Sequence, residues 1–246
     1  MMPNFQFVLN QQFQQGCFLA QQAVMAEQMS NVPGAIQCYD QAIGLIANTI
    51  GMASQSGIPV LDNVFFVYGY CHFNSGRLKA ALGWGQYTPM HLMQALQALN
   101  QAITINPNFF QYHSAAGVVL VAQGAIPAAV QAFERAVQLN PADAWSQWMI
   151  SSLYSAQGNV VQANRYYAAA AQVQSNLPPP QVYAFSAPAA ASQDSRVHES
   201  KHDWFDLINN ALKLGNSIAG VFEQASGGMQ SSGWNMQGSG GDCPSG

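Results

Sequence analysis

The stretch GAIPAAVQAFERAVQLNP, from Gly124 to Pro141, decides the fold of this chain. Ala129, Phe133 and Ala136 stand at i, i+4 and i+7, so they lie on one face of a helix. The two alanines let a neighbouring helix approach, and Phe133 fills the space between them. Gly124 stands where a preceding helix must end and turn back, which favours positive φ, and Pro141 ends the second helix. The stretch therefore predicts the second of two antiparallel helices.

The same features recur along the chain at a step of 34 residues. Asn106-Pro107 recurs as Asn140-Pro141, and Gly124 recurs as Gly158. Two alanine columns and one column of large residues keep this step: Ala95, Ala129 and Ala163; Ala102, Ala136 and Ala170; Leu99, Phe133 and Tyr167. A fixed period of this length indicates stacked helix pairs, each of which buries its apolar face against the next.

These columns resemble those of the tetratricopeptide repeat family. The best copy spans residues 110–143 and carries the family's small, aromatic and proline columns at Gly117, Gly124, Ala129, Phe133, Ala136 and Pro141. A second copy spans 144–177 and carries Tyr154, Gly158, Ala163, Tyr167 and Ala170, but it ends in Ser175 instead of proline.

Two weaker copies precede these. The copy at 62–109 is interrupted by an insertion at 77–94, which we expect to protrude and to hold about one helical turn. The earliest copy, 16–49, follows an N-terminal extension, 1–15, and it lacks the glycine and the closing proline. Terminal repeats are often atypical because they cap the stack.

The resemblance implies an all-α fold, a right-handed α-solenoid of antiparallel helix pairs. In this family the first helix of each pair lines a concave face that binds peptides or helices and performs no chemistry. The positions that the resemblance implies for this ligand groove are Asn63, Phe66, Tyr70, Phe73, Asn74, Gln111, Ser114, Val118, Trp145 and Trp148.

The segment DNVFFVYGYCHFNSG, residues 62–76, is apolar on two sides of the predicted helix. Phe65, Tyr68 and His72 belong to one stripe, and Phe66, Tyr70 and Phe73 form a second. Such a helix is either buried on both sides or holds a ligand on its second face, and the sequence leaves both interpretations open.

Some members of the family grip acidic chaperone tails with lysine and arginine. Within the repeats this chain has only Arg77, Lys79, Arg135 and Arg165, and none of them falls on a groove position. A chaperone-tail clamp is therefore disfavoured. The expected ligand is an apolar or amphipathic helix, bound mainly by burial of its side chains.

The composition excludes several other classes. The chain has 246 residues, 49% hydrophobic and only 7% charged, with a net charge of −4, so it has no basic patch for nucleic acid. The cysteines Cys17, Cys38, Cys71 and Cys243 show no C-x-x-C spacing, and we expect free thiols. Without a secretory signal or a span of about 18 apolar residues, a cytoplasmic location is expected.

The composition changes near residue 178. Residues 178–200 are rich in proline, alanine and serine and predict a linker, and the Gly/Ser-rich residues 225–246 predict a disordered tail. Between them, 203–224 predicts an amphipathic docking helix that Asp203 could cap. Its apolar face comprises Trp204, Leu207, Ile208, Ala211, Leu212, Ile218 and Phe222.

The docking helix needs a surface to bury against. The groove of its own chain, the groove of another copy and a membrane are the three alternatives. A membrane is disfavoured because Lys213 is the one cation on the polar face, whereas helices that bind membrane surfaces are usually rich in lysine and arginine.

The motif HESKH, from His198 to His202, matches the pattern of zinc proteases. However, Lys201 stands inside it, and a third ligand at Glu223 would lie about 30 Å away along the same helix. His72, His91 and His113 are expected to be packed histidines. We therefore predict no catalytic residue, metal ligand or cofactor.

Taken together, the sequence predicts a non-enzymatic protein-interaction scaffold. Its neutral, aromatic groove binds an apolar or amphipathic helix, which could be the C-terminal helix of the same chain. The alternative is a structural protein that assembles into oligomers or filaments through tail-in-groove contacts. A zinc metalloprotease that uses HESKH is the remote alternative.

Overall fold

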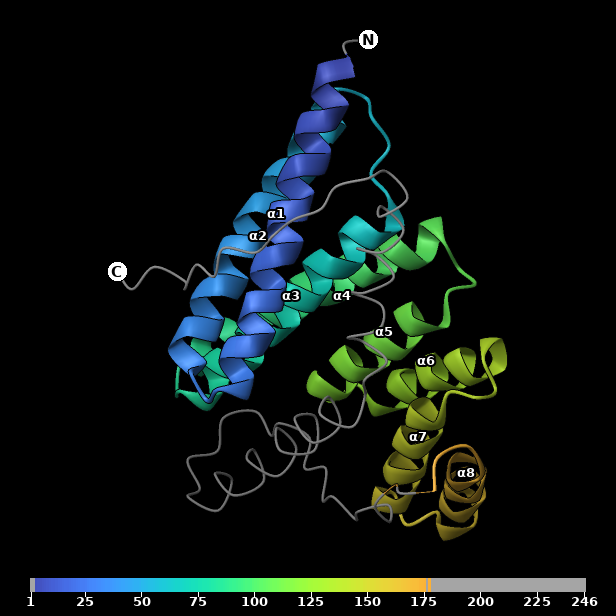
Figure 1. Cartoon of the computed structure of the whole chain (residues 1–246). Helices are drawn as coiled ribbons and strands as arrows, with labels where there is room; N and C mark the ends of the chain where they lie inside the picture. The colour runs from blue at the N-terminus through green and yellow to red at the C-terminus, as the bar shows by residue number, and fades with distance from the viewer. Residues whose placement is uncertain (1–2, 176, 178–246) are drawn as a thin grey trace. The chain divides into compact units, whose positions relative to one another are not determined.

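The computed structural model describes residues 3–175 and 177, which are helical apart from short connections (Figure 1). The helices are α1 (Pro3–Gln28), α2 (Val32–Gln55), α3 (Asp62–Ala81), α4 (Thr88–Ile105), α5 (Phe110–Ala122), α6 (Ile126–Leu139), α7 (Ala144–Ala156) and α8 (Val160–Val173), with a 3-10 turn, η1 (Gly85–Tyr87), before α4. The predicted linker, docking helix, HESKH motif and tail lie outside the described residues.

Successive helices pack as antiparallel pairs, α1 with α2, α3 with α4, α5 with α6 and α7 with α8 (Figure 1). The described helices fall into two compact units, one of α1 to α4 and the other of α5 to α8. The prediction of an all-α fold built from helix pairs is confirmed. In the second unit, each pair occupies one predicted copy of the 34-residue repeat.

The columns of the repeat form the contact between α5 and α6. Phe133 is fully buried, as are Ala129 and Ala136 on the same face of α6. A Cβ atom added to Gly117 of α5 would lie 2.8 Å from the Phe133 ring, so only glycine lets the two helices approach this closely. Gly124 ends the first helix with a φ of 74°, the left-handed conformation that its sequence position predicts.

The helices of the first unit are longer than those of the second. α1 has 26 residues and α2 has 24, whereas α5 has 13 and α6 has 14. The copy predicted at 16–49 lies within the first pair, and α1 begins well before it, at Pro3. Asn31 caps α2, because its side chain accepts a hydrogen bond from the amide of Gly34 at 3.0 Å.

The insertion expected at 77–94 is mostly helical. α3 continues to Ala81, α4 begins at Thr88, and the connection between them holds the single turn η1. Gly83 has a φ of 81°, which lets the chain leave α3. The additional residues therefore lengthen both helices of the pair, and the protruding part is shorter than we expected.

The cysteines are partly as predicted. Cys17 and Cys71 are buried free thiols, and burial raises the pKa of Cys17 to about 12. Cys38 is disulfide-bonded, which corrects the expectation of a free thiol there. Cys243 lies outside the described residues. Among the helices that the structure describes, none is both long and apolar enough to span a bilayer.

Candidate functional site

The groove positions predicted in the first unit lie on α3, and most of their side chains are buried. Phe66 and Phe73 are buried, and Tyr70 is half-buried. Asn74 is fully buried; it donates a hydrogen bond to the carbonyl of Tyr70 at 2.9 Å and accepts one from Nε of Arg77 at 2.7 Å. Asn74 is therefore part of an internal network.

That network joins three helices of the first unit. Arg77 of α3 forms an ion pair with Glu27 of α1, and the hydroxyl of Tyr39 in α2 donates to Oε1 of Glu27 at 2.8 Å. Nearby, Lys79 of α3 pairs with Asp40 of α2 at 2.9 Å. Both cations of α3 are thus engaged by carboxylates within the unit.

The groove positions predicted in the second unit lie on α5 and α7, which the structure brings together. Oγ of Ser146 in α7 donates to Oγ of Ser114 in α5 at 2.9 Å, and both hydroxyls are buried. Val118 is buried one turn further along α5. On α7, the rings of Trp145 and Trp148 are buried and stacked, with centroids 5.4 Å apart.

Buried polar atoms without a hydrogen-bond partner follow a simple rule in the described residues. All of them lie on the first helix of a pair or at its N-cap. They are Oε1 of Gln12 on α1, Oδ1 of Asn63 and Nε2 of His72 on α3, Oε1 of Gln111 on α5, Oδ2 of Asp143 at the cap of α7, and Oε1 of Gln147 and Oγ of Ser152 on α7. Asn63 and Gln111 are two of the predicted groove positions.

A pocket of about 290 Å³ lies at the N-terminus of α7, within the second unit. Its lining is Phe110, Asn140, Ala142, Asp143, Ala144, Trp145, Val173, Gln174 and Leu177. Trp145 is a predicted groove residue. The other lining residues are the first residue of α5, the loop before α7 with the first residue of α7, and the end of α8 with residues just after it. The family correspondence did not include any of them.

Asp143 is the charged residue of this pocket, and sequence reasoning missed it. Its Oδ1 accepts a hydrogen bond from the amide of Ser146 at 3.2 Å, whereas its buried Oδ2 has no partner. Burial raises the pKa of Asp143 above its usual range. The signal was present, since an aspartate directly before an apolar helix is a typical N-cap. The pocket therefore combines a buried carboxyl group with the rings of Phe110 and Trp145.

His72 and His91 form a buried pair between α3 and α4, with 3.1 Å between their Nδ1 atoms. Lys79 carries only donors, so its Nζ donates to Nε2 of His91 at 3.2 Å. Nδ1 of His91 therefore carries the proton and donates it to His72, and Nε2 of His72 is left without a partner. The expectation of packed histidines is confirmed here, although their mutual contact was not foreseen.

This pair predicts that acid weakens the fold. Burial, followed by the charge on His91, lowers the pKa of His72 to about 4, and burial also lowers the pKa of His91. Between about pH 6.5 and 4 the unfolded chain therefore binds more protons than the folded one, so stability falls as pH falls. At His72 the loss is at most about 3 kcal/mol by pH 4.

Urea unfolding of the wild type and of His72→Leu, at pH 7 and at pH 4.5, measures this effect. The variant should lose less stability on acidification than the wild type. His113→Gln, in the second unit, is the control and should keep the wild-type loss. An equal loss in the wild type and in His72→Leu would contradict the prediction.

The described residues contain no group of three or more histidine, cysteine, aspartate or glutamate side chains that could hold a metal ion. Burial raises the pKa of Cys71, next to His72, well above its usual range, so the thiol is protonated at neutral pH.

The helix pairs, the glycine turns and the recurring alanine and aromatic columns define an all-helical repeat protein with a tetratricopeptide-like fold. Solved structures with a similar helix arrangement include two of MamA. One is 15% identical and covers 62% of this chain and 94% of its own, with a TM-score of 0.37, and the other is 14% identical and covers 65% and 92%, with a TM-score of 0.36.

A third similar structure is that of YrrB, described as a TPR protein with an unusual peptide-binding site. It is 16% identical and covers 64% of this chain and 86% of its own, with a TM-score of 0.36. No protein-family model and no curated protein matches the sequence. The class of the chain therefore rests on its own repeat and helix pairs.

Proposed function

We propose that this chain is a non-enzymatic protein-interaction scaffold, in which the first helices of the pairs hold an apolar or amphipathic segment. The observation that carries the proposal is the placement of the unpaired polar atoms on these helices, including Asn63 and Gln111. A buried polar atom without a partner costs about 1–3 kcal/mol, and native proteins leave few of them unpaired. The side chains of Asn63 and Gln111 are half-buried, so they can turn outward and accept hydrogen bonds from amide or hydroxyl donors of a bound segment.

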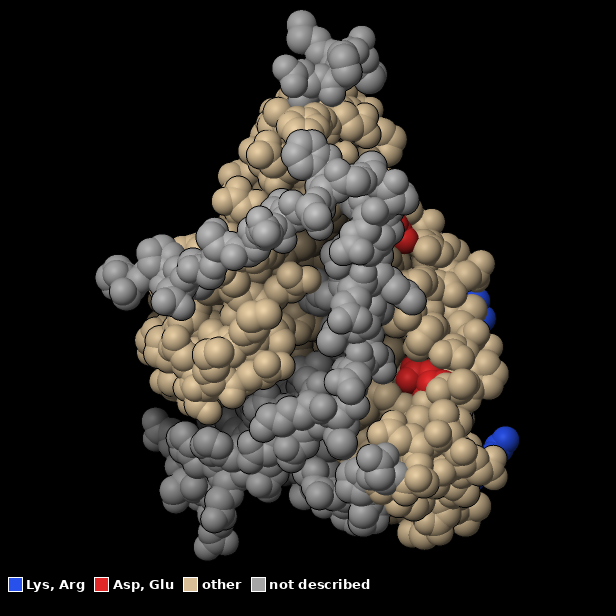
Figure 2. Space-filling view, in the orientation of Figure 1, with Lys and Arg blue, Asp and Glu red and all other residues tan. Residues whose placement is uncertain are grey.

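The character of the ligand follows from the charges around these helices. Arg77 and Lys79 are engaged by carboxylates, and the face in Figure 2 carries few charged side chains over the described residues. Neither an acidic tail nor a basic segment would meet many side chains of opposite charge among the described residues of this face. The favoured ligand is therefore neutral, and burial of its apolar side chains supplies most of the binding free energy.

Residues 203–224 are the candidate segment within the chain itself, because their apolar face, from Trp204 to Phe222, matches a neutral groove. If this segment binds in its own chain, it competes with an outside partner and regulates the scaffold. If it binds in a second copy, the chain assembles head to tail, which is the alternative function.

A photo-crosslinking amino acid at position 111 of the full chain tests the proposal. Gln111 is half-buried and carries an unpaired acceptor, so a segment bound there lies within reach. We expect crosslinks to residues 203–224. A mixture of ¹⁴N-labelled and ¹⁵N-labelled copies separates the two arrangements, because only binding in trans produces crosslinks of mixed label.

The same crosslinker at Gln131, which is exposed on α6, is the matched control and should give few crosslinks. Crosslinks from position 111 to 203–224 at no higher yield than from position 131 would refute this segment as the occupant. If, in addition, position 111 gives no crosslink to any protein of a cell extract, the groove itself is refuted as a binding surface.

A further inference from the structure

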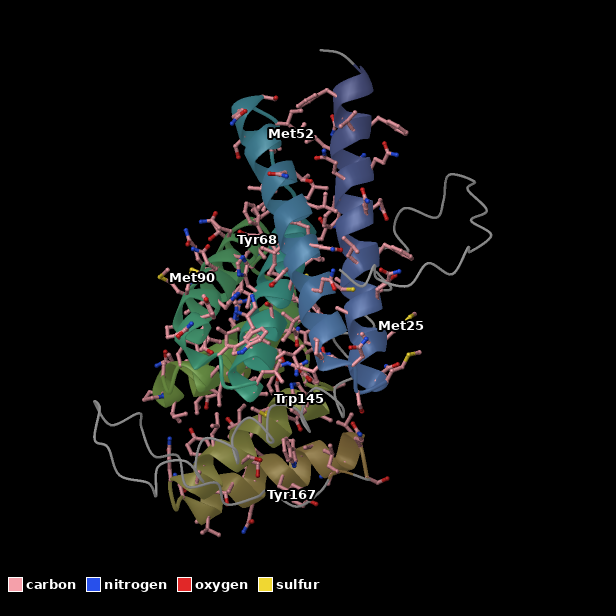
Figure 3. The ribbon with its side chains drawn as sticks, turned by 90° about the vertical axis from the view of Figure 1, so that its left-hand side faces the viewer. Met25, Met52, Tyr68, Met90, Trp145 and Tyr167 are labelled. Atoms are coloured by element: carbon pink, nitrogen blue, oxygen red, sulfur yellow. The ribbon has the colours of Figure 1, made fainter. Side chains whose placement is uncertain are left out.

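The outer face of α1 carries a row of large apolar side chains that are exposed. We call it the α1 stripe and define it as Phe7, Phe18, Met25 and Met29, whose exposed fractions are 62%, 54%, 58% and 80%. Figure 3 shows Met25 pointing away from α2. The opposite face of α1, with Leu9, Phe13, Ala20 and Ala23, is buried.

The members of the stripe share one side of the helix. At about 100° per residue, Phe7, Phe18 and Met25 lie within about 20° of one another, and Met29 lies about 40° from Phe7. Met29 follows the end of α1, but its amide still donates to the carbonyl of Met25 at 3.0 Å, so the helical path continues. The stripe therefore runs about 33 Å along α1, parallel to its axis.

The α1 stripe carries no charged side chain that would favour its exposure to water. Between its members the outer face has glutamines, such as Gln11 and Gln21. Glu27 is the single charged residue within α1, and it is engaged by Arg77 and Tyr39 on the inner side. Single exposed apolar side chains need no explanation, but four of them on one side of a helix, with only uncharged glutamines between, favour an interaction surface.

We propose that the α1 stripe binds the α1 stripe of a second copy of this chain, with the two helices antiparallel about a two-fold axis beside Phe18. The spacing of the stripe supports this occupant. Phe18 stands midway between Phe7 and Met29, eleven residues from each. An antiparallel pair centred there places Phe18 against its symmetry mate and each Phe7 against the Met29 of the other copy.

Both kinds of side-chain contact in this arrangement are stabilising. Two phenylalanine rings at the axis can stack or meet edge to face, and a methionine sulfur against an aromatic ring is a stabilising contact. In the same register Met25 lies opposite Gln11, whose aliphatic part can cover it. The face is thus complementary to itself, as an isologous dimer interface must be.

The area agrees with a weak, specific dimer. Four side chains of about 200 Å² each, exposed by roughly 60%, present about 500 Å² per copy, or about 1,000 Å² in total. This total is at the lower end for a specific interface. We therefore expect a dissociation constant on the order of 10 μM, and a closed dimer that does not grow further.

Sedimentation velocity of the full chain, from about 1 to about 300 μM, tests the proposal. The wild type should pass from monomer to dimer over this range. Phe18→Glu places two like charges at the axis, so it should raise the dissociation constant more than about 100-fold. Val161→Glu, at an exposed apolar position on α8, adds the same charge elsewhere and should leave the dimer intact.

Cysteine substitutions test the register. In the antiparallel arrangement Phe18→Cys places the two sulfurs at the axis, where oxidation should link the copies, whereas Met29→Cys places them about 33 Å apart and should not. Helical circular dichroism confirms that each variant is folded.

Three results would overturn the dimer: a wild type that stays monomeric at about 300 μM, a dimer that survives Phe18→Glu, or growth beyond the dimer that Phe18→Glu leaves unchanged. Crosslinking by Met29→Cys as readily as by Phe18→Cys would overturn the antiparallel register. Position 111 lies on α5, a different surface from the α1 stripe. The crosslinks from position 111 can therefore be absent while the dimer forms, and they can be present while the dimer does not form.

Discussion

Replacing Arg77 with methionine should lower the free energy of unfolding of the first unit by about 3–5 kcal/mol. The substitution removes the cation and leaves the Glu27 carboxylate partly buried, since the two side chains are only 8% and 21% exposed. The hydroxyl of Tyr39, at 2.8 Å from Oε1 of Glu27, cannot replace a full positive charge. Asn74 also loses the donor that pairs with its Oδ1. Urea unfolding at pH 7, followed by circular dichroism, measures the loss.

A double-mutant cycle separates the ion pair from the packing of the long side chain. Glu27→Gln combined with Arg77→Met should be more stable than Arg77→Met alone, because no unpaired charge is left behind. Arg135→Met, in the second unit, is the matched control: Arg135 is exposed and donates to Gln138 at the surface, so this loss should stay below about 1 kcal/mol. Equal losses for Arg77→Met and Arg135→Met would show that the buried ion pair does not hold the first unit together.

The sequence predicted the second unit well because its repeat is nearly regular. The alanine and aromatic columns and Gly124 have a direct geometrical meaning, and the structure has the turn and the buried Phe133 where they require them. The first unit was predicted less well. α1 is rich in glutamine, which has no strong preference for burial, so its start at Pro3 left little trace in the periodicity.

The polar contacts of the first unit could not be predicted for a different reason. Arg77 and Glu27 are 50 residues apart in sequence, and His72 and His91 are 19 apart. Whether such residues meet depends on how far each helix extends and which face it turns toward its neighbours. The insertion at 77–94 changes both, because it lengthens α3 and α4 where a regular repeat would have ended them.

The groove remains a prediction, and fewer of its aromatic side chains are accessible than the sequence suggested. Phe66, Phe73, Trp145 and Trp148 are buried, so the interpretation in which aromatic side chains pack inside the protein holds for much of the expected surface. What distinguishes the first helices is the set of unpaired polar atoms. Periodicity cannot find such atoms, because a hydrogen-bond deficit depends on every neighbour of a side chain.

Phe133→Ala should destabilise the second unit by about 3–5 kcal/mol, the second large effect that we expect. The ring is fully buried between α5 and α6, and Gly117 gives the space on the other side. The alanine would leave a cavity that the flanking helices cannot close, because Ala129 and Ala136 already bring α6 as near as their side chains allow. The midpoint of urea unfolding, read by circular dichroism, measures the loss.

Gly117→Ala tests the same contact from the other helix. Its new Cβ would lie 2.8 Å from the Phe133 ring, which is tighter than a normal contact, so the variant should lose about 1–3 kcal/mol. Adding Phe133→Leu, which shortens the opposing side chain, should recover part of that loss. Gly44→Ala is the control: its Cβ meets nothing within 4 Å, so it should stabilise α2 by up to about 1 kcal/mol. If both glycine variants shift stability in the same direction, the close approach of α5 and α6 is not what requires glycine at position 117.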